Sequence, residues 1–517
     1  MRPETVKHWI DLSAAMGYNA LMLYTEDTYE IPGEPYFGYG RGRYSVQEVR
    51  ELDDYAAAHG VELIPCIQTL AHLNTLKRWP AYEPHFDIDD VLLAGDEAVY
   101  ALIEKMFDTV TACFRTRTVH IGMDEAHHMC RGRYYDQHGD ADRAQVLLEH
   151  LNRVAEIGKK HGVRLCMWSD MFFRLACGGE YYAKDVQIDR SVSALIPENI
   201  ELVYWDYYHS EKSHYDAMFT AHETLKSGTW FAGGLWTWTG FAPHNAFSIA
   251  TMREAMKACH AKGVENVVMT MWGDNGAECS KFAVLPALFT VSQMAQDIDD
   301  VETIHANFER EFGIPFEEFR ALDLIGTQND SAEAIYNPEK YLLYCDPFMG
   351  QFDNRVKSGD AAGYADCAAR LSRYESHAEY GYLFRSLRTL CAFLSVKADL
   401  GIRTRAAYLS GDKKAAKALC TDYDAALERL DAFYAAYEQQ WMHENKPQGF
   451  DVIDLRIGGQ RQRLLHCRDR LLAYAEGRLD RIEELEEPVL DCCCEEKADG
   501  QATRAIFWHE IASANVI

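Results

Sequence analysis

Apolar residues in the first half of the chain alternate between helical spacing and short continuous runs. Helix-like segments end at Gly17, Gly60, Gly162 and Gly263, and each is followed at once by an apolar run such as YNALMLYTED or VRLCMWSD. Glycine suits the left-handed turn that ends a helix, and continuous apolar runs are typical of parallel strands buried on both faces. The pattern therefore predicts repeated helix–strand units around a parallel sheet.

Seven strands are predicted in this way, near residues 19–25, 61–67, 118–124, 164–169, 201–207, 229–238 and 265–273. Alternating helices and parallel strands over about 280 residues favour an α/β fold, the (β/α)8 TIM barrel. A closed barrel of this kind has eight strands, and this chain opens on a helix. We therefore expect a barrel that lacks its first strand.

The pattern changes near residue 290, where long amphipathic segments with helical spacing begin. We expect a barrel domain over residues 1–288 and an α-helical C-terminal domain over residues 289–517. Within the second domain, HENKPQGFDVIDLRIGG (443–459) reads as a polar loop between two helices. The segment EELEEPVLDCCCEEKADGQATR (483–504) reads as a flexible acidic tail.

Composition narrows the class of protein. Of 517 residues, 48% are hydrophobic, which permits a large core, and the formal charge of −28 argues against nucleic acid and anionic membranes as partners. The 15 cysteines include no C-x-x-C pair, which argues against a disulfide framework. The start MRPETVKHWI has no apolar signal region, and no run is long enough to span a membrane. We expect a soluble cytoplasmic protein.

Polar and aromatic residues gather at the predicted carboxyl ends of the strands, where a barrel of this type forms its active site. Five of the ten tryptophans lie there, with carboxylates beside them. Indole faces stack on the C–H patches of a sugar ring, and carboxylates bind its hydroxyls, so the pattern indicates a carbohydrate pocket. Any one of these residues alone has an ordinary structural explanation, and only the coincidence over six strand ends favours the pocket.

The stretch TVHIGMDEAHH (118–128) places Asp124 and Glu125 side by side, followed by His127 and His128. A helicase box would need a phosphate-binding loop, which the sequence does not contain. A metal site is a minor alternative. Because side chains alternate along a strand, adjacent carboxylates can serve one pocket only where the strand ends and the backbone bends. They would then not straddle a glycosidic bond as ordinary retaining pairs do; one would act on the leaving oxygen and the other on a neighbouring substrate group.

GMDEAH on this strand resembles the Asp-Glu signature of glycoside hydrolase family 20, the β-N-acetylhexosaminidases. The strings LMLYTEDTYEIPGEPYFGYGRGRYS, ELIPCIQTLAHL, MWSDMFFRL, LVYWDYY and MWGDNGAE, with NKPQGFDVIDLRIGG and the ending FWHEIASANVI, are similar to a bacterial intracellular branch with a helical C-terminal domain. The resemblance implies an exo-acting, retaining enzyme that releases terminal GlcNAc or GalNAc by substrate-assisted catalysis. The partner would be an oligosaccharide or glycoconjugate with a terminal β-linked N-acetylhexosamine, and no cofactor or metal is expected.

The resemblance also implies catalytic roles. Asp124 would orient the acetamido N–H and stabilise the oxazolinium-like intermediate, and Glu125 would act as general acid and then as general base. His72 would support the acid/base Glu125, and either Glu26 or Asp27 would complete that relay.

Substrate contacts are expected from further residues. Tryptophans would wall the pocket, a tyrosine would bind the acetamido carbonyl, and an aspartate would bind sugar hydroxyls. These residues are Trp168, Trp205, Trp236, Trp238, Trp272, Tyr207, Tyr208 and Asp274. The family carries a sugar-binding arginine on its first strand, which this chain lacks; Arg41 or Arg43 would partly substitute for it, or would form a structural salt bridge.

Two other functions remain open at this level. One is an amino-sugar-binding barrel without turnover, motivated by the lacking strand, and the other is a metal-dependent sugar isomerase or hydrolase. The sequence does not distinguish GlcNAc from GalNAc or set the linkage, and it leaves room for a homodimer.

Overall fold

The computed structural model describes residues 1–183, 188, 193–226, 228–327, 337–492 and 508–509, and the chain forms two compact units. Unit 1 comprises Met1–Gly234 and Thr251–Thr270, and unit 2 comprises Leu235–Ala250 and Met271–Ile517. The segments that follow the last two strands therefore group with unit 2. A division into domains at residue 288 stays a prediction.

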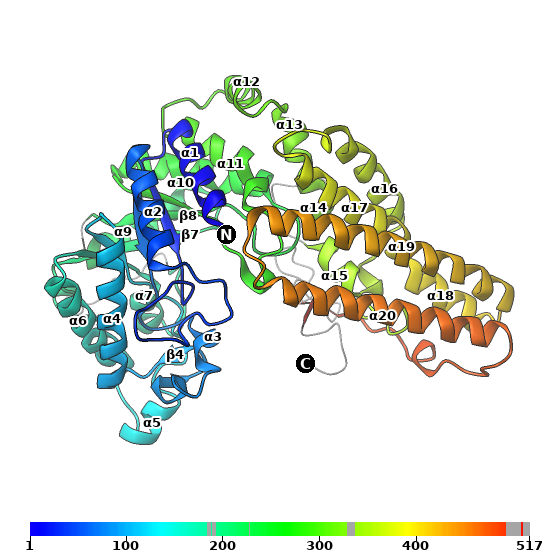
Figure 1. Cartoon of the computed structure of the whole chain (residues 1–517), viewed down its shortest axis with the longest axis horizontal. Helices are drawn as coiled ribbons and strands as arrows, with labels where there is room; N and C mark the ends of the chain where they lie inside the picture. The colour runs from blue at the N-terminus through cyan, green and yellow to red at the C-terminus, as the bar shows by residue number, and fades with distance from the viewer. Residues whose placement is uncertain (184–187, 189–192, 227, 328–336, 493–507, 510–517) are drawn as a thin grey trace. The chain divides into compact units, whose positions relative to one another are not determined.

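Unit 1 is built on a parallel sheet of seven strands in the order β1-β2-β5-β6-β7-β8-β9. Figure 1 labels β7 and β8 of this sheet and colours the chain from blue at the N-terminus to red at the C-terminus. The strands are β1 (Ala20–Tyr24), β2 (Glu62–Cys66), β5 (Thr118–His120), β6 (Arg164–Trp168), β7 (Ile200–Asp206), β8 (Trp230–Gly234) and β9 (Val267–Thr270). Each neighbouring pair is parallel. The prediction of seven parallel strands in chain order is thus confirmed.

The sheet is open between its first and last strands. Among the described residues, no strand pairs β1 with β9, which is the gap that the sequence pattern predicted. Both edge strands are mainly half-buried, whereas β7 and β8 are buried along nearly their whole length. The inner strands β7 and β8 are therefore the more deeply buried part of the sheet.

Helices alternate with these strands. They are α1 (Pro3–Met16), α2 (Val46–Ala58), α3 (Asn74–Lys77), α4 (Glu97–Cys113), α5 (Arg133–His138), α6 (Arg143–Lys160), α7 (Asp170–Ala176), α9 (Lys212–Leu225) and α10 (Asn245–Lys262). A short η1 (Glu83–His85) leads into an antiparallel pair that was not predicted, β3 (Phe86–Ile88) and β4 (Val91–Leu92). The four glycines expected to end helices all have left-handed φ values, from 65° to 87°.

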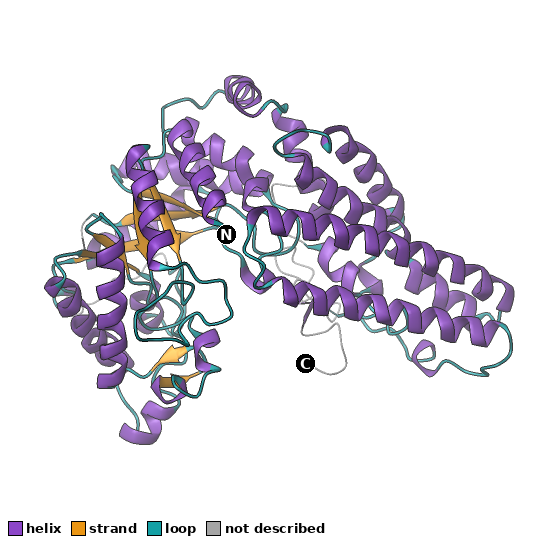
Figure 2. Ribbon diagram, in the orientation of Figure 1, coloured by secondary structure: helices purple, strands orange, loops and turns teal. Residues whose placement is uncertain are grey.

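Unit 2 is mainly helical, as Figure 2 shows in purple. Its elements are η2 (Asp274–Gly276), η3 (Lys281–Val284), α11 (Leu285–Met294), α12 (Val301–Phe312), α13 (Phe316–Phe319), η4 (Arg320–Asp323), α14 (Leu324–Thr327), α15 (Pro338–Tyr344), η5 (Asp353–Arg355), α16 (Asp360–Leu371), η6 (Ser372–Tyr374), α17 (Gly381–Lys397), α18 (Leu400–Leu409), α19 (Lys413–Glu444), α20 (Phe450–Ala475) and η7 (Glu483–Leu485). Helix α17 packs against α16 and α19, and α19 packs against α20. The expected α-helical C-terminal region is confirmed.

The predicted loop 443–459 is wrong over most of its length. Helix α19 continues to Glu444, and α20 begins at Phe450, so only residues 445–449 connect them. Phe450, Ile453 and Ile457 recur at helical spacing and are buried, which gives this polar segment one apolar face. The polar, glycine-containing composition of the segment led to the prediction of a loop where α20 begins.

Two further expectations concern the C-terminal tail and the cysteine thiols. The segment 483–504 was expected to be a flexible acidic tail, but its first residues form η7 and are held by Arg405, which donates to Leu485 O and Glu487 O at 2.7 Å. The rest of the segment from 493 onward, with Cys493 and Cys494, lies outside the described residues, as does most of the ending FWHEIASANVI. The described cysteines from Cys66 to Cys467 are free thiols. Within the described part of the chain, no helix has the length and apolarity that a membrane crossing needs.

Two mid-helix glycines offer a matched test of the packing between α6 and the sheet. A Cβ added at Gly158 in α6 would lie 2.8–3.0 Å from three side-chain atoms of Leu165, which is fully buried on β6. A Cβ at Gly459 in α20 would meet nothing within 4 Å. We expect Gly459→Ala to stabilise the protein by about 0.5–1 kcal/mol through helix propensity, and Gly158→Ala to destabilise it by about 1–2 kcal/mol through overpacking. Thermal unfolding temperatures of the two variants should shift in opposite directions; equal upward shifts would contradict the packing.

Candidate active site

The ends of β2 and β5 bring the two predicted carboxylates to one histidine. His72 Nε2 lies 3.2 Å from Asp124 Oδ2 and 3.9 Å from Glu125 Oε2. The two strands are direct neighbours, with Cys66 paired to His120, so the segments that follow them start side by side. The structure thus brings together three of the residues that the sequence singled out.

The backbone bends sharply where β5 ends. Gly122, Met123 and Glu125 all have φ between 54° and 69°, in the left-handed region. A non-glycine residue there costs on the order of 1–2 kcal/mol, so two of them close together mark a segment held by its surroundings. The bend turns both side chains toward His72, as adjacent carboxylates serving one pocket require.

Gly122 makes room for the side chain that fixes Asp124. A Cβ at Gly122 would lie 1.9 Å from Gln68 Oε1, so only glycine allows this approach. Gln68 Nε2 donates to Asp124 Oδ1 at 3.1 Å and lies 3.2 Å from the Tyr24 hydroxyl. Asp124 is therefore held from one side by an amide and from the other by His72.

Opposite charges sustain this arrangement. Burial alone would lower the pKa of His72, but nearby carboxylates, above all Asp124, raise it to about 10. Burial alone would raise the pKa of Asp124, but the charge and hydrogen bond of His72, with the hydrogen bond from Gln68, keep that pKa below its ordinary value. At neutral pH the pair is therefore an imidazolium and a carboxylate.

Glu125 is placed by residues of the β6 end. Its backbone N–H donates to Asp170 Oδ2 at 3.1 Å, which pins the left-handed conformation. Arg174 Nε donates to the same oxygen at 3.0 Å, and Arg174 Nη2 lies 3.8 Å from Glu125 Oε1. Burial and the nearby Asp124 charge raise the pKa of Asp170 to about 7. The Glu125 side chain is 41% exposed and that of Asp124 is 15% exposed, so Glu125 is the one open to an incoming group.

Glu26 and Asp27 are bound by an arginine rather than by His72. Arg41 Nη2 lies 2.9 Å from Glu26 Oε2, and Arg41 Nε lies 2.9 Å from Asp27 Oδ1. On its other side His72 faces Asp90, whose Oδ2 is 3.8 Å from His72 Nδ1 and accepts the His72 backbone N–H at 2.9 Å. A relay through Glu26 or Asp27 stays a prediction; Asp90 is the carboxylate that faces His72 Nδ1, whereas Asp124 faces His72 Nε2.

Arg43 lies in the loop after β1. Its guanidinium donates to the backbone carbonyls of Pro35 and Phe37. Arg43 therefore helps to shape that loop, whereas Arg41 binds the two acids; sugar binding by Arg43 stays a prediction.

Aromatic side chains gather at the ends of β6 and β7. Trp168 is buried, with its ring centroid 4.3 Å from that of His120. Trp205 stacks on Tyr207 at 5.2 Å, and both are buried, whereas Tyr208 is exposed. Gly234 on β8 permits the position of the Tyr207 ring, because a Cβ there would lie 2.5 Å from that ring. Of the two candidate tyrosines, Tyr207 is thus the one fixed by packing.

The remaining predicted substrate residues belong to unit 2. Trp236 stacks on Trp238, with ring centroids 4.1 Å apart. Trp272 O accepts a hydrogen bond from the Thr237 hydroxyl at 2.7 Å, which ties the two strand-end segments together. Asp274 begins η2. A role for Trp236, Trp238, Trp272 and Asp274 in sugar binding stays a prediction.

Unit 2 holds the segment around Asp274 with buried charges. Asn275 and Ala277 have left-handed φ values near 50°. Arg456 of α20 donates to Asn275 O at 2.9 Å and pairs with Glu278 at 3.0 Å. Lys340 of α15 pairs with the second Glu278 oxygen at 2.5 Å, and both side chains are almost fully buried. The C-terminal helices thereby fix the conformation of this segment.

A cluster after β7 has the composition of a metal site. Asp206, His209 and His214 offer ligand atoms within 4.8 Å of one another. Asp206 is already bound by donors, since Oδ2 accepts from the Tyr204 hydroxyl at 2.7 Å and lies 2.8 Å from His209 Nδ1. Burial would raise the pKa of Asp206, but the two histidines lower it to about 2. Hydrogen bonds thus hold Asp206, whereas both buried ring nitrogens of His214 lack a hydrogen-bond partner among the described residues, although Nε2 lies 3.2 Å from Asp206 Oδ2.

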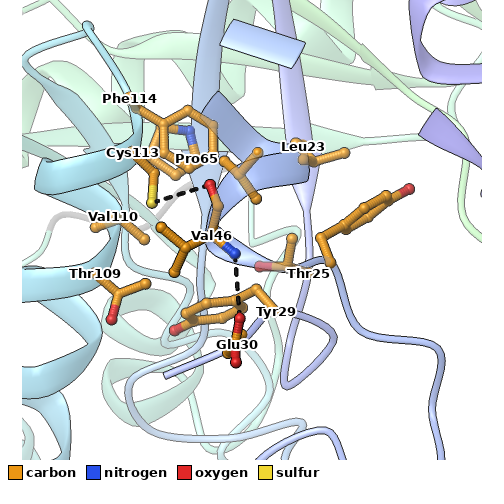
Figure 3. A pocket seen from close by; sticks show the side chains of 12 residues that line it. Leu23, Thr25, Tyr29, Glu30, Val46, Pro65, Thr109, Val110, Cys113 and Phe114 are labelled. Carbon is orange, nitrogen blue, oxygen red and sulfur yellow. Dashed lines mark hydrogen bonds between the residues drawn. The ribbon is translucent and has the colours of Figure 1, made fainter. Parts of the chain in front are cut away.

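An apolar cavity in unit 1 lies apart from these residues. Its lining includes Leu23, Pro65, Val110 and Phe114, and none of the predicted site residues (Figure 3). Its polar contacts are internal, such as the Val46 N–H donating to Glu30 at 3.3 Å. We interpret it as space between β1, β2 and the helices outside them.

Sequence reasoning missed several residues of the site. The sequence pattern assigned no role to Tyr24, Gln68, Asp90, Asp170 or Arg174. Asp90 lies on an unpredicted hairpin, and Arg174 lies one helical turn beyond Asp170. The i, i+4 spacing of Asp170 and Arg174 on a helix was the one signal that could have been used.

Family models match most of the chain. The model described as "Glycosyl hydrolase family 20, catalytic domain" matches residues 1–266, and the model described as "Glycoside Hydrolase 20C C-terminal domain" matches residues 315–504.

Among curated relatives, hexosaminidase D of Bos taurus is 25% identical over 249 residues, covering 44% of this chain and 65% of that protein. A beta-hexosaminidase of Porphyromonas gingivalis is 26% identical over 148 residues, covering 25% of this chain and 19% of that protein. The chain thus matches less than two thirds of the length of these relatives. Among solved structures, the β-N-acetylhexosaminidase of Bacteroides fragilis has a TM-score of 0.44 and 17% identity, covering 60% of this chain and 68% of that one.

The charge state of His72 can be tested directly. We expect selectively 15N-labelled His72 to be an imidazolium at pH 8 and to lose its proton near pH 10, because the Asp124 charge stabilises the proton. His120, whose pKa is lowered to about 4 by burial, serves as a neutral control in the same spectra. Since the folded-state pKa of His72 is raised, its stabilisation is complete below about pH 6.5 and is lost as the pH rises to 10. In Asp124→Asn the pKa of His72 should fall; an unchanged value would contradict the pairing.

Proposed function

The chain belongs to glycosyl hydrolase family 20, and we propose that it is a glycoside hydrolase, a β-N-acetylhexosaminidase that acts from the chain end with retention of configuration. Its substrate would be an oligosaccharide or glycoconjugate with a terminal β-linked GlcNAc or GalNAc. The observation that carries the proposal is the bend at residues 122–125, which directs Asp124 and Glu125 to the same histidine. Two adjacent carboxylates do not straddle a bond, so the substrate must supply the nucleophile.

In this mechanism Asp124 acts on the acetamido group of the sugar. Its carboxylate, kept anionic by His72, accepts the acetamido N–H and thereby orients the carbonyl oxygen toward the anomeric carbon. That oxygen forms a bond to the anomeric carbon while the glycosidic bond breaks. The positive charge that develops on the resulting oxazolinium lies against Asp124, which favours the transition state.

Glu125 handles the proton. It first donates a proton to the departing glycosidic oxygen, and its carboxylate then removes a proton from the water that attacks the anomeric carbon. The acetamido oxygen leaves the anomeric carbon in that second step, so two inversions give net retention. The exposure of Glu125 and its left-handed backbone, pinned by Asp170, support this role.

Two further features belong to the proposal. Trp168, Trp205 and Tyr207 would form part of the sugar-binding wall, supported by their shared location at the ends of β6 and β7. The protein would work in the cytoplasm, which the free thiols from Cys66 to Cys467 support. Fractionation of source cells would test the location.

Substrate choice tests the reaction class. We expect hydrolysis of a chromogenic N-acetyl-β-glucosaminide and at least a hundredfold lower kcat/KM on the matching β-glucoside, which lacks the acetamido nucleophile. Activity should persist in EDTA; its loss would favour a metal-dependent enzyme and would direct attention to Asp206, His209 and His214. Calorimetric binding of GlcNAc with no hydrolysis would instead favour an amino-sugar-binding barrel, an alternative motivated by the open sheet.

The two carboxylates should differ in their effects. Glu125→Gln should lower kcat about 10²- to 10⁴-fold on a substrate with a poor leaving group and less with a nitrophenolate, which needs no general acid but still needs the general base for the attacking water. Asp124→Asn should lower kcat on both substrates, because the acetamido step precedes both. Asp136→Asn on α5 replaces an exposed carboxyl as the matched control. A leaving-group dependence shared by both site variants would contradict the division of roles.

A further inference from the structure

An exposed aromatic cluster in unit 1 has no part in the roles assigned above. It consists of Tyr36, Tyr39 and Trp79, and we call it the aromatic platform. The ring centroids of Tyr36 and Tyr39 lie 5.4 and 5.3 Å from that of Trp79. Tyr36 is 45% exposed and Tyr39 is 56% exposed. Large rings that contact one another at the surface indicate a place where another molecule binds.

The loop that carries the two tyrosines is firmly held. A bridge between Tyr29 and Tyr44 closes its base, and Phe37 at its centre is fully buried against Tyr29. Glu34 accepts the Tyr82 hydroxyl at 2.6 Å and pairs with Lys105 at 2.5 Å. The exposed rings are therefore presented by a preorganised loop, which lowers the entropic cost of binding.

Arg78, the residue before Trp79, contacts both the Trp79 ring and the loop that carries the tyrosines. The Arg78 guanidinium lies 5.0 Å from the Trp79 ring centroid, and Arg78 Nη2 donates to Tyr39 O at 3.1 Å. The platform thus joins the loop after β1 to the segment after β2.

These are the same two segments that carry Glu26, Asp27 and His72. Arg41, two residues after Tyr39, binds both Glu26 and Asp27. The hydroxyl of Thr75 donates to Asp27 Oδ2 at 3.1 Å, and only helix α3 and its flanking residues separate His72 from Trp79. The platform is therefore continuous with the loops that hold the His72–Asp124 pair.

The chemistry of the platform favours a neutral sugar ring. Aromatic faces contact the C–H patches of a pyranose, and the phenol and guanidinium groups can bind its hydroxyls. In an exo-acting enzyme the terminal sugar fills the pocket, so the next sugar of the chain must leave past the surrounding loops.

We propose that the aromatic platform binds the sugar unit on the leaving-group side of the cleaved bond, and so makes the enzyme selective for oligosaccharide substrates. This inference rests on the proposed function and extends it to the substrate class.

Two substrates separate the platform from the catalytic step. N,N′-diacetylchitobiose carries a second sugar, whereas N-acetyl-β-glucosaminyl fluoride has no leaving group that could reach the platform. We expect Tyr39→Ala and Tyr36→Ala each to lower kcat/KM for the disaccharide about tenfold and to leave the fluoride unchanged. Tyr39→Phe should keep most of the activity on the disaccharide, because it keeps the ring. Tyr135→Ala on α5 removes an equally exposed tyrosine, at 53%, and is the matched control.

The outcomes distinguish this inference from the proposed function. Equal losses on both substrates, or unchanged kcat/KM for the disaccharide, would overturn the platform while leaving the hydrolase assignment intact. Absence of hydrolysis of both substrates by the unmodified protein would overturn the proposed function. Calorimetry with the disaccharide would then test sugar binding by the platform separately from catalysis. A Kd unaffected by Tyr39→Ala would refute binding at the platform, and a higher Kd would support it.

Discussion

The ion pair between His72 and Asp124 is the interaction on which the rest of the candidate site depends. Two adjacent carboxylates near a buried position repel each other, and burial penalises each of them. The imidazolium of His72 lies within 4 Å of both and offsets that repulsion. Without this positive charge, the bend would hold two negative charges close together, with the Gln68 amide beside Asp124 and Arg174 3.8 Å from Glu125.

The same site stores backbone strain that the sheet must support. Left-handed φ values occur after three strand ends: at Glu26 after β1, at His72 after β2, and at Met123 and Glu125 after β5. Their conformations are fixed by specific partners, such as Asp90 for the His72 N–H and Asp170 for the Glu125 N–H. Parallel strands anchor these short segments at one end of the sheet. The packing of the sheet therefore offsets the backbone strain in the residues that follow the strand ends.

The predicted and observed structures differ where a residue's partner is remote in sequence. Strand positions and glycine helix ends followed from periodicity and local backbone preference, which are short-range properties. The carboxylate partner of His72 could not be predicted in this way. Glu26 and Asp27 bind Arg41, and His72 faces Asp90, which lies on a hairpin whose strands are too short to show an alternation of apolar and polar residues. The start of α20 was missed for a related reason, since its three buried apolar residues are spread among charged ones.

By itself, the sequence determined the seven parallel strands, the helical C-terminal region and the acids at the end of β5, because apolar periodicity and adjacency along the chain are local facts. Only the tertiary structure decided that Gln68 fits over Gly122, that Asp170 pins Glu125 and that Tyr36 and Tyr39 meet Trp79. Each of those contacts joins segments 40 or more residues apart. Their formation depends on which strands become neighbours and on how each strand end bends, and no local pattern in the chain encodes either.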